Sequence, residues 1–501
     1  MSGGGGMNIL PLLLAAPFAG ACVCAVSGKR FAALVRTAAS LAVFWLSLRA
    51  AARVCLGGAF AWEAAGLAVD GLSALLLVTV GLIGFAVSLY THGYLAPSAR
   101  EGGFSALFLL MTGGMVGTVC AADLVSLVAF LEIASLASYA LVAHGGGKDA
   151  LEAGFKYLAI GCLASLFAFL GAAVLRSATG AASLADAASA LAAPGATPAL
   201  RLAAGLLIAG FGTKAALAPF HAWLPDAHTS APAPVSAMLS GVLVKALGVY
   251  ALLRLFLAAP GPGVAGVLAT LAAVSIIGGA LLAAAQHDYK RLLAWSSVSQ
   301  VGYIVAGAAT GTSLGMAGAL LHLCAHSAAK SALFLSAGAV DRAAGTRDLR
   351  RLGGLRERMP VTASSSLAAS LSLAGVPPLG GFWSKLLILL GCVEAGLGGL
   401  ACAAALGSLL TLGAVMKAQR AIFYGELRPH WDAVREAPPS MRAPMVALAV
   451  LSAAAGLLLL PGPPRALLAG ARDALRGTRQ AARFAAGDAA EARAKNGVRL
   501  R

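Results

Sequence analysis

The stretch FGTKAALAPFHAWLPDAH, residues 211–228, places a lysine between a long apolar run and two prolines. Lys214 lies 13 residues after Arg201, which is roughly 20 Å along a helix axis. Pro219 and Pro225 follow it, although an ordinary spanning helix needs neither proline. The stretch therefore predicts an interrupted membrane helix with a charged group deep inside the bilayer.

The composition of the whole chain is that of an integral membrane protein. Of its 501 residues, 59% are hydrophobic and only 11% are charged, which excludes soluble domains with polar surfaces. Apolar runs of roughly 18 to 25 residues recur, and each can cross a hydrocarbon core about 30 Å thick. Such long runs predict an all-α polytopic membrane protein with about 14 transmembrane helices rather than a barrel of short strands. The runs lie near residues 7–26, 31–55, 70–90, 103–120, 123–143, 154–177, 200–221, 232–258, 263–285, 289–310, 314–340, 361–393, 399–424 and 443–461.

The basic residues predict an orientation in the membrane. The formal charge is +17, but the Lys and Arg residues sit in loops between spans, so we expect no nucleic-acid partner. With the amino terminus outside, odd-numbered loops hold roughly 18 Lys and Arg and even-numbered loops roughly 5. The larger basic loops, including 287–291 and 347–358, then face the cytoplasm of a plasma (inner) membrane. The tail after Pro461 carries nine more basic residues and would end outside. Either it is an amphipathic surface helix, which we favour, or the span count is wrong by one.

The eight cysteines are scattered and form no CxxC pair. This spacing argues against an iron–sulfur or structural zinc site, so we predict that the chain itself binds no cofactor or metal. Nor does any nucleophile and base combination suggest an intramembrane enzyme.

A few ionisable residues remain at bilayer depth once loops and tail are set aside. Each such charge costs at least about 2.5 kcal/mol on insertion scales, so partners, water or function must offset it. Lysines that snorkel to the membrane surface and Lys–Glu pairs that only stabilise the fold are the non-functional explanations for such residues. We interpret these ionisable residues as functional. The residues are Glu132, Lys214, Lys245, His322, His326, Lys330 and Lys385, with Arg36 nearer a span end.

His322, His326 and Lys330, in HLCAHSAAK, recur every four residues and so share one helix face. The pair of histidines alone does not make a metal site, because no further ligands are suggested nearby. A hydrated proton-relay stripe is the preferred interpretation, and histidines that only pack between helices are the alternative.

Two spans are predicted to be broken. Pro219 lies five residues after Lys214, and GVPPLGGFWSK places Pro377 and Pro378 before Lys385. Backbone groups freed at such depth are tolerated only inside protein or beside water, so both breaks point to a hydrated interior. Because the breaks fall in the fourth span of two successive sets of five, we predict two inverted five-helix repeats.

This repeat pattern divides the chain into five parts. They are helices 1–3 in residues 1–102, a first repeat in 103–258, a second repeat in 263–424, a last transmembrane helix in 443–461 and a basic amphipathic tail in 462–501.

Other polar residues have two interpretations each. His221, Asp226 and His228 surround WLPDAH at an expected cytoplasmic mouth, where they either collect protons or cap and pack a loop. Lys156 starts a span, where snorkelling explains it best. Asp70 and Asp123 are expected to be helix caps.

Four runs carry a resemblance to a known family. The runs are FGTKAALAPFHAWLPDAHTSAPAPVSAMLSGVLVKALGVYALLR, DYKRLLAWSSVSQVGYIVAG, HLCAHSAAKSALFLSAG and SLAGVPPLGGFWSK. With these runs the chain resembles the antiporter-like membrane subunits of respiratory complex I, and equally the D-type subunits of Mrp antiporters and the membrane subunits of energy-converting hydrogenases. The resemblance covers roughly residues 65–425, and its motifs are highly specific.

The resemblance implies a role for each buried charge. Glu132 matches the family's fifth-helix glutamate, Lys214 the lysine of its broken seventh helix, and Lys245 the eighth-helix lysine. The histidine stripe with Lys330 matches the eleventh-helix polar stripe. Lys385 matches the ionisable residue of the second broken helix, where some complex I relatives have glutamate.

Three hypotheses for function follow. The first is a proton-translocating subunit of a redox-driven complex, not catalytic by itself, whose partner membrane, iron–sulfur and quinone- or hydrogen-reactive subunits handle electrons. The second is a D-type subunit of a multisubunit Na⁺/H⁺ antiporter with small antiporter subunits as partners. The third is a structural membrane scaffold whose charges only guide assembly.

Overall fold

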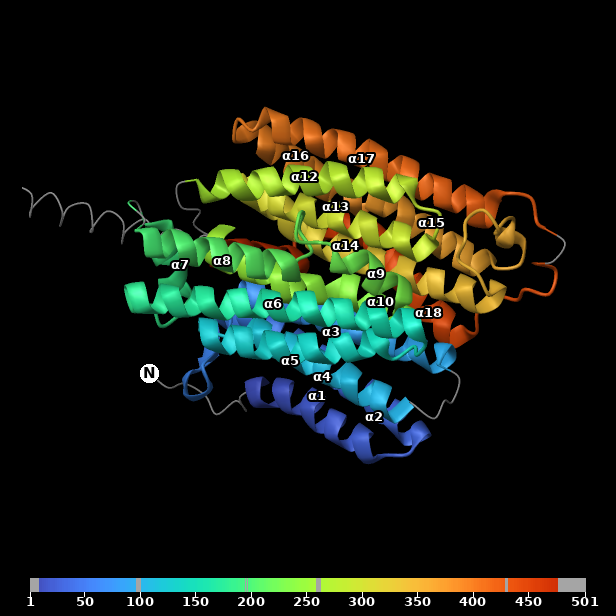
Figure 1. The fold of residues 1–501 in the computed structure, drawn as a ribbon, viewed down its shortest axis with the longest axis horizontal. Helices are drawn as coiled ribbons and strands as arrows, with labels where there is room; N and C mark the ends of the chain where they lie inside the picture. Colours follow the sequence, from blue (N-terminus) through green and yellow to red (C-terminus); the bar gives the residue numbers. More distant parts are fainter. Residues whose placement is uncertain are drawn as a thin grey trace, which may run out of the picture.

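The computed structural model describes residues 9–95, 101–193, 195, 197–257, 263–428 and 431–475. In these ranges the chain is a nearly all-helical bundle whose long helices run side by side (Figure 1). Twelve helices among the described residues are long and apolar enough to cross a membrane. The predicted helical membrane class is therefore confirmed, while two of the fourteen predicted runs, 200–221 and 361–393, are not continuous spans.

The first third of the chain supplies six long helices and one short hairpin. Asp70 and Asp123 accept hydrogen bonds from the backbone of Ser73 and Ser126 and cap α3 and α5, as predicted. The helices are α1 (Ile9–Val26), α2 (Lys29–Gly57), α3 (Gly71–Tyr94), α4 (Glu101–Cys120), α5 (Leu124–Ala143) and α6 (Lys148–Thr179).

The all-α prediction is wrong in one detail, because a two-stranded hairpin joins α2 to α3. Strands β1 (Phe60–Trp62) and β2 (Leu67–Val69) pair antiparallel around the one-turn helix η1 (Glu63–Ala65). Gly66 takes the left-handed conformation that the turn requires. Sequence periodicity could not reveal strands of three residues beside much longer apolar runs.

The first predicted break is present. Helix α8 (Pro198–Lys214) ends at Lys214. The next helix, α9 (Trp223–Ser230), begins after Pro219. Before α8, the short α7 (Leu184–Ala192) starts with a capping box at Ser183.

The next span, Ala233–Phe256, is fully buried and repeatedly widens into π-helix. Single π-turns inside α-helices often occur at functional sites, and this span carries Lys245. Its parts are α10 (Ala233–Met238), η2 (Leu239–Leu243), η3 (Lys245–Val249), α11 (Tyr250–Leu252) and η4 (Leu253–Leu257).

The second half contains the other predicted break, since α15 and α16 are separated by residues 375–379, which include Pro377 and Pro378. In Figure 1 the second half forms the upper part of the bundle, with α12, α16 and α17 at its edge and α14 inside. Its elements are α12 (Val264–Ala285), α13 (Tyr289–Ala309), α14 (Ser313–Ala344), η5 (Leu355–Glu357), α15 (Pro360–Ala374), α16 (Gly380–Glu394), α17 (Gly398–Gln419), η6 (Arg420–Tyr424), α18 (Pro439–Ala454) and η8 (Ala455–Leu459).

The predicted tail begins as a helix over residues 463–475. Leu468, Ala471 and Leu475 are buried along it, at the three- and four-residue spacing of one helix face. It packs closely on the start of α3, where a Cβ added to Gly71 would lie 2.1 Å from the carbonyl carbon of Gly470. The rest of the tail, 476–501, lies outside the described residues.

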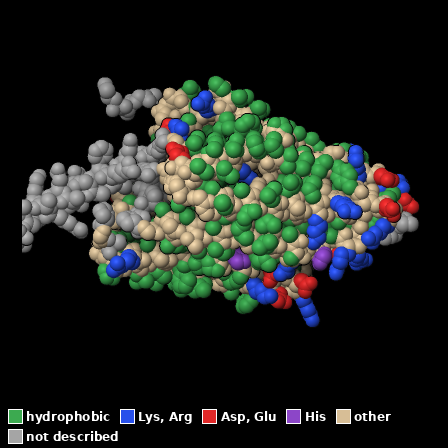
Figure 2. Space-filling model, turned by 90° about the horizontal axis from the view of Figure 1, so that it is seen from above, with side chains coloured by type: hydrophobic (Ala, Val, Ile, Leu, Met, Phe, Trp, Pro, Cys, Tyr) green, Lys and Arg blue, Asp and Glu red, His purple; other side chains and the backbone are tan. Residues whose placement is uncertain are grey.

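The polar loops gather at one end of the bundle. The loops around 287–291 and 345–352 lie side by side, because Tyr289 N donates to Arg347 O and Leu349 N donates to His287 O. Figure 2 shows hydrophobic side chains over the middle of one face, with most visible Lys and Arg toward the end that these loops occupy.

Candidate functional site

Four of the predicted lysines lie inside the bundle. Lys214, Lys245, Lys330 and Lys385 are each at most 7% exposed, so none of them faces lipid. They come from α8, η3, α14 and α16, of which α8 packs on η3 and α14 packs on α16. A row of buried cations in one membrane domain points to an ion pathway or proton relay.

Lys214 is paired with Glu132. Its Nζ lies 3.7 Å from Glu132 Oε2 and donates hydrogen bonds of 2.9 Å to the hydroxyls of Ser135 and Tyr139. Ser165, on α6, donates a hydrogen bond to the carboxylate of Glu132. The Lys214 ammonium group is thus close to the Glu132 carboxylate, but its direct hydrogen bonds go to neutral hydroxyl oxygens. In this arrangement the two charged groups can approach and separate.

The end of α8 places Lys214 at the break. Ala216 has a φ of 54°, in the left-handed region, which stops the right-handed helix. Ala216 N donates to Thr213 O and Leu217 N donates to Gly212 O, the two bonds of a Schellman turn. The Trp223 indole donates to Thr213 O, so the following helix is tied to the same turn.

Lys245 lies at the start of η3, completely buried, and its Nζ donates to Ser240 O one turn earlier. The Ser240 hydroxyl is 2.8 Å from that of Ser297 on α13. Close approach of η3 to the break depends on Gly248, because a Cβ there would lie 2.1 Å from Ala215 N. The π-helical span therefore lies directly between the Lys214 break and the helices of the second half.

The predicted stripe on α14 is buried along its whole length. The rings of His322 and His326 lie 5.9 Å apart, and His322 Nδ1 is 2.9 Å from Ser384 Oγ. Lys330 Nζ donates to Leu293 O and to the hydroxyl of a serine on α13. Neither ring nitrogen of His326 has a hydrogen-bond partner among the described residues. Buried nitrogens without partners are costly, so this position is suited to a bound water or a transferred proton.

Lys385 follows the second break on α16. A Schellman turn also ends α15, with Gly375 N donating to Ser372 O and Val376 N donating to Leu371 O. Lys385 Nζ lies 3.2 Å from Ala374 O, 3.3 Å from Ser408 Oγ and 4.5 Å from the centre of the Tyr303 ring. Because Ser384 touches His322, the stripe on α14 leads to this lysine.

The three residues predicted at a cytoplasmic mouth do not share one environment. Asp226 is partly exposed and pairs with Arg291 at 3.0 Å and with Lys156 at 3.8 Å. His228 is completely buried against Phe334, although it lies only two residues further along α9. His221 is half-buried, with its ring 5.0 Å from that of a tryptophan on α13. Two residues are about half a helical turn, so Asp226 and His228 point to different sides of α9 and these residues do not form a single surface cluster.

Sequence reasoning missed two buried charged groups. Lys290 was assigned to a cytoplasmic loop, but it is 2% exposed inside α13 and donates to Ala231 O. The signal available was its position two residues after the capping residue Asp288, which places it in the first turn of the helix. Glu101 is also buried, 2.5 Å from the Arg36 guanidinium, and this pair fixes α2 against α4.

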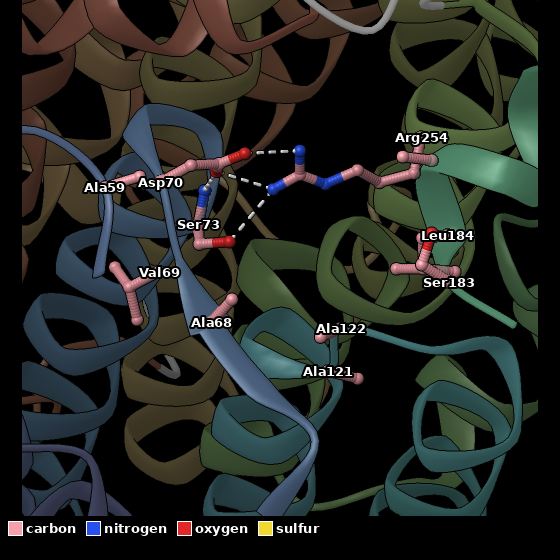
Figure 3. A pocket seen from close by; sticks show the side chains of 11 residues that line it. Ala59, Ala68, Val69, Asp70, Ser73, Ala121, Ala122, Ser183, Leu184 and Arg254 are labelled. Carbon is pink, nitrogen blue, oxygen red and sulfur yellow. Dashed lines mark hydrogen bonds and ion pairs between the residues drawn. The ribbon is translucent and has the colours of Figure 1, made fainter. Parts of the chain in front are cut away.

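A pocket lies beside the start of α3 (Figure 3), whereas the other end of α3, at Tyr94, contacts Arg342 near the basic loops. It encloses about 230 Å³ and contains the paired side chains of Asp70 and Arg254, joined by two hydrogen bonds of 2.6 Å. Burial raises the pKa of Asp70, but the Arg254 charge and hydrogen bonds from Arg254 and Ser73 outweigh burial and hold it below its usual range. A charged pair therefore forms part of the lining of this otherwise mostly apolar pocket.

The polar residues of the site do not form an evident metal centre. Among the described residues, no group of three or more His, Cys, Asp or Glu side chains is close enough together to hold a metal ion. The buried histidines instead neighbour serine and lysine side chains.

Comparison with known proteins gives a consistent result. A protein-family model described as NADH:quinone oxidoreductase/Mrp antiporter, TM, matches residues 121–411. The N-type subunit of an NADH-quinone oxidoreductase from Desulforudis audaxviator is 40% identical over 383 residues, which cover 75% of this chain and 76% of that protein. The D-type subunit of a Na⁺/H⁺ antiporter from Alkalihalophilus pseudofirmus is 32% identical over a region that covers 79% of this chain and 80% of that protein.

The fold is also shared with a solved structure. A chain of the Mrp complex from Dietzia sp. DQ12-45-1b superposes with a TM-score of 0.86 at 26% identity, covering 95% of this chain and 99% of that one. That chain belongs to a multisubunit membrane complex, and both relatives are named as subunits. The matched family segment contains every predicted relay residue from Glu132 to Lys385.

Proposed function

This chain belongs to the NADH:quinone oxidoreductase/Mrp antiporter transmembrane family, whose members are proton-translocating, antiporter-like membrane subunits, and from that premise we propose that it moves protons through its buried row of charges in a redox-driven complex. The observation that carries the proposal is the Glu132–Lys214 pair at the end of a broken helix, with 3.7 Å between the charged groups.

The first step is switching at Lys214. An opposite charge within about 4–6 Å favours the protonated amine, whereas burial disfavours it. While Glu132 is near, Lys214 keeps its proton; when the pair opens, Lys214 gives it up. The hydroxyls of Ser135 and Tyr139, which already accept hydrogen bonds from the amine, support this transfer.

The later steps use the second half of the chain. The proton passes from Lys214 to Lys245, then along the stripe of His322, His326 and Lys330, and reaches Lys385, which releases it on the outer side. The close packing of η3 on the first break and the contact between His322 and Ser384 support this order. Water beside the unpartnered histidine nitrogens completes the path, since buried polar groups are normally satisfied by protein or water.

The same proposal includes the arrangement of the fold. The two interrupted segments, α8–α9 and α15–α16, count as crossings and bring the total from twelve to fourteen. Residues 103–258 and 263–424 are two inverted repeats, the amino terminus is outside, and the basic loops face the cytoplasm. Each break begins with a Schellman turn beside a buried lysine, which supports a repeated design.

Electron transfer is assigned to other subunits. We propose that this chain binds no cofactor and that partner chains carry the iron–sulfur and quinone- or hydrogen-reactive groups. The chain then acts as the membrane part of a larger machine and is not catalytic by itself.

The test uses Lys214→Ala in the assembled complex, in inverted membrane vesicles. We expect proton translocation per turnover to fall at least about tenfold, equivalent to ~1.4 kcal/mol. Lys156→Ala is the matched control, because Lys156 lies in the same half but its side chain is 50% exposed. Normal translocation by an assembled Lys214→Ala complex would reject the relay.

The Na⁺/H⁺ antiporter role remains the second candidate, because the D-type subunit of an antiporter and a chain of the Mrp complex are both similar to this chain. Purification of the intact assembly decides between the two. Iron–sulfur and quinone- or hydrogen-reactive chains in it support the redox-driven pump. Small membrane antiporter subunits, together with Na⁺-dependent proton exchange, support the antiporter.

A further inference from the structure

Helix α15 carries a stripe of hydroxyl groups that the relay does not use. Thr362, Ser366 and Ser370 are at most 2% exposed and recur every four residues, so they share one face of the helix. The next position on this face is Ala374, whose carbonyl oxygen accepts the hydrogen bond from Lys385. The stripe therefore runs from the first turn of α15 to the second broken helix.

Two neighbouring helices contribute to the same stripe. The Gln419 amide, from the end of α17, donates to Ser366 Oγ at 2.7 Å and to Ser370 Oγ at 2.9 Å. The hydroxyl of Tyr289, from the start of α13, is 2.9 Å from Ser366 Oγ. These five side chains, Thr362, Ser366, Ser370, Gln419 and Tyr289, are called the α15 polar thread below.

The inner end of the α15 polar thread reaches Lys385. Ser408, on α17, donates to Ala374 O at 2.8 Å and lies 3.3 Å from Lys385 Nζ. Thr411, one turn further along α17, is 3.4 Å from the amide nitrogen of Gln300. Hydroxyl and amide groups therefore continue from Ser370 to the lysine with gaps of about one helical turn.

The outer end reaches the surface that carries the basic loops. Thr362 donates to Glu436 Oε1 at 2.6 Å, and Glu436 Oε2 accepts from the amide of Val361 at 2.8 Å. Glu436 is partly exposed, so a negative charge stands where the thread meets solvent. A carboxylate at such a mouth raises the local concentration of cations, including protons.

Gln419 of the thread and Gln300 beside Thr411 also have unused hydrogen-bonding capacity. The side-chain oxygens of Gln419 and Gln300 have no partner among the described residues, although both residues are at most 2% exposed. Buried amide oxygens are rarely left unsatisfied, and a water needs two to four polar partners. The amide nitrogens of the same two side chains bond Ser366, Ser370 and Thr411, so water bound at the oxygens would lie next to these hydroxyls.

We propose that the α15 polar thread is a second proton entrance, which loads Lys385 from the end with the basic loops without passing through Lys214. The inference rests on the proposed function, because it takes Lys385 as the group that releases protons outward. It differs from a purely structural role, in which the serines only allow α13, α15 and α17 to pack closely.

Thiol labelling tests whether the thread is open to water. In the assembled complex in inverted vesicles, Ser366→Cys and Ser370→Cys are treated with a small cationic methanethiosulfonate reagent. We expect both to react at least about tenfold faster than Ser299→Cys. Ser299 is a matched control, since it is completely buried on α13 but bonds Ile276 O away from the thread. Peptide mass spectrometry separates these positions from the eight native cysteines. Equal rates at 370 and 299 would overturn the proposal.

Proton transfer tests whether the thread is used. The residual translocation of Lys214→Ala is expected to disappear when Gln419→Leu is added and to persist with Gln286→Leu, a change at a partly exposed glutamine away from the thread. No residual translocation in Lys214→Ala, or a residual that Gln419→Leu leaves unchanged, would overturn the second entrance.

Lys385→Ala separates the two proposals. If Lys385→Ala abolishes translocation while the thread variants leave translocation unchanged, only the second entrance is rejected. If Lys385→Ala has no effect on translocation, the proposed function itself is rejected.

Discussion

Asp70 and Arg254 show how single residues at the ends of spans differ from those in the middle. Arg254 meets Asp70 through two hydrogen bonds and also donates to Ser73 at 3.0 Å, so the two charges are in direct contact (Figure 3). Lys214, in contrast, is held by neutral hydroxyls with its counterion 3.7 Å away. The Asp70–Arg254 contact stabilises the ionised form of both side chains, whereas the looser Lys214–Glu132 contact allows Lys214 to gain and lose a proton.

The Asp70 pair predicts a pH-dependent stability. Because the folded pKa of Asp70 is lowered, its contribution is complete above the unfolded value of about 3.9 and is lost as pH falls through the lower folded pKa. Asp70→Asn should lower the unfolding free energy at neutral pH by about 1–3 kcal/mol and remove this part of the acid sensitivity. Thermal unfolding of the purified complex between pH 7 and about pH 3 measures both effects.

Asp149→Asn is the control for this experiment, because Asp149 is exposed in the first turn of α6. It should change the unfolding temperature little at any pH. An Asp70→Asn complex as stable as the native one at neutral pH would contradict the prediction.

At the level of elements, breaks and close contacts position the charges. The Schellman turn that ends α8 leaves Lys214 at the last helical position, and η3 packs directly on the residue after it. Prolines in the sequence located both breaks, but only the packing of η3 shows which helix lies against the first one. Lys290 and the α15 polar thread were not foreseen, because burial of a helix end depends on loops far away in the sequence.

Gly248→Ala is expected to disturb this contact. The new Cβ would lie 2.1 Å from Ala215 N, so the two backbones must separate, at a cost of about 1–3 kcal/mol from overpacking. The shift would also move Lys214 relative to Glu132, and proton translocation should fall with stability. Gly278→Ala, on α12, is the matched control, since nothing lies within 4 Å of its added Cβ. Equal behaviour of the two variants in unfolding and vesicle assays would refute the role of the contact.

For the whole molecule, the two ends of the bundle are chemically different. Basic loops gather at one end, whereas the hairpin, the Asp70 pocket and the helix at 463–475 lie at the other. By the positive-inside rule, we expect the loop end to face the cytoplasm. The amino end and the tail helix would both be outside, which requires an even number of crossings.

Labelling from each side of the membrane checks this orientation. Arg350→Cys, where the native side chain is 69% exposed, should react with an impermeant thiol reagent only in inverted vesicles. Glu63→Cys, in the exposed turn of the hairpin, should react only in intact cells or right-side-out vesicles. Reaction of both positions from the same side would mean an even number of crossings between them and would reject the fourteen-helix topology.

Local patterns of residues are enough to predict the membrane class, the two breaks and the identity of most buried charges. These features depend on local composition: apolar runs must be long enough to span a bilayer, and charges within them are too costly to be accidental. Tertiary structure alone decided which groups meet. The distance between Glu132 and Lys214, the burial of Lys290 and the thread from Glu436 to Lys385 join residues that are far apart along the chain. Such contacts follow from how whole helices pack, and no local pattern of residues contains that information.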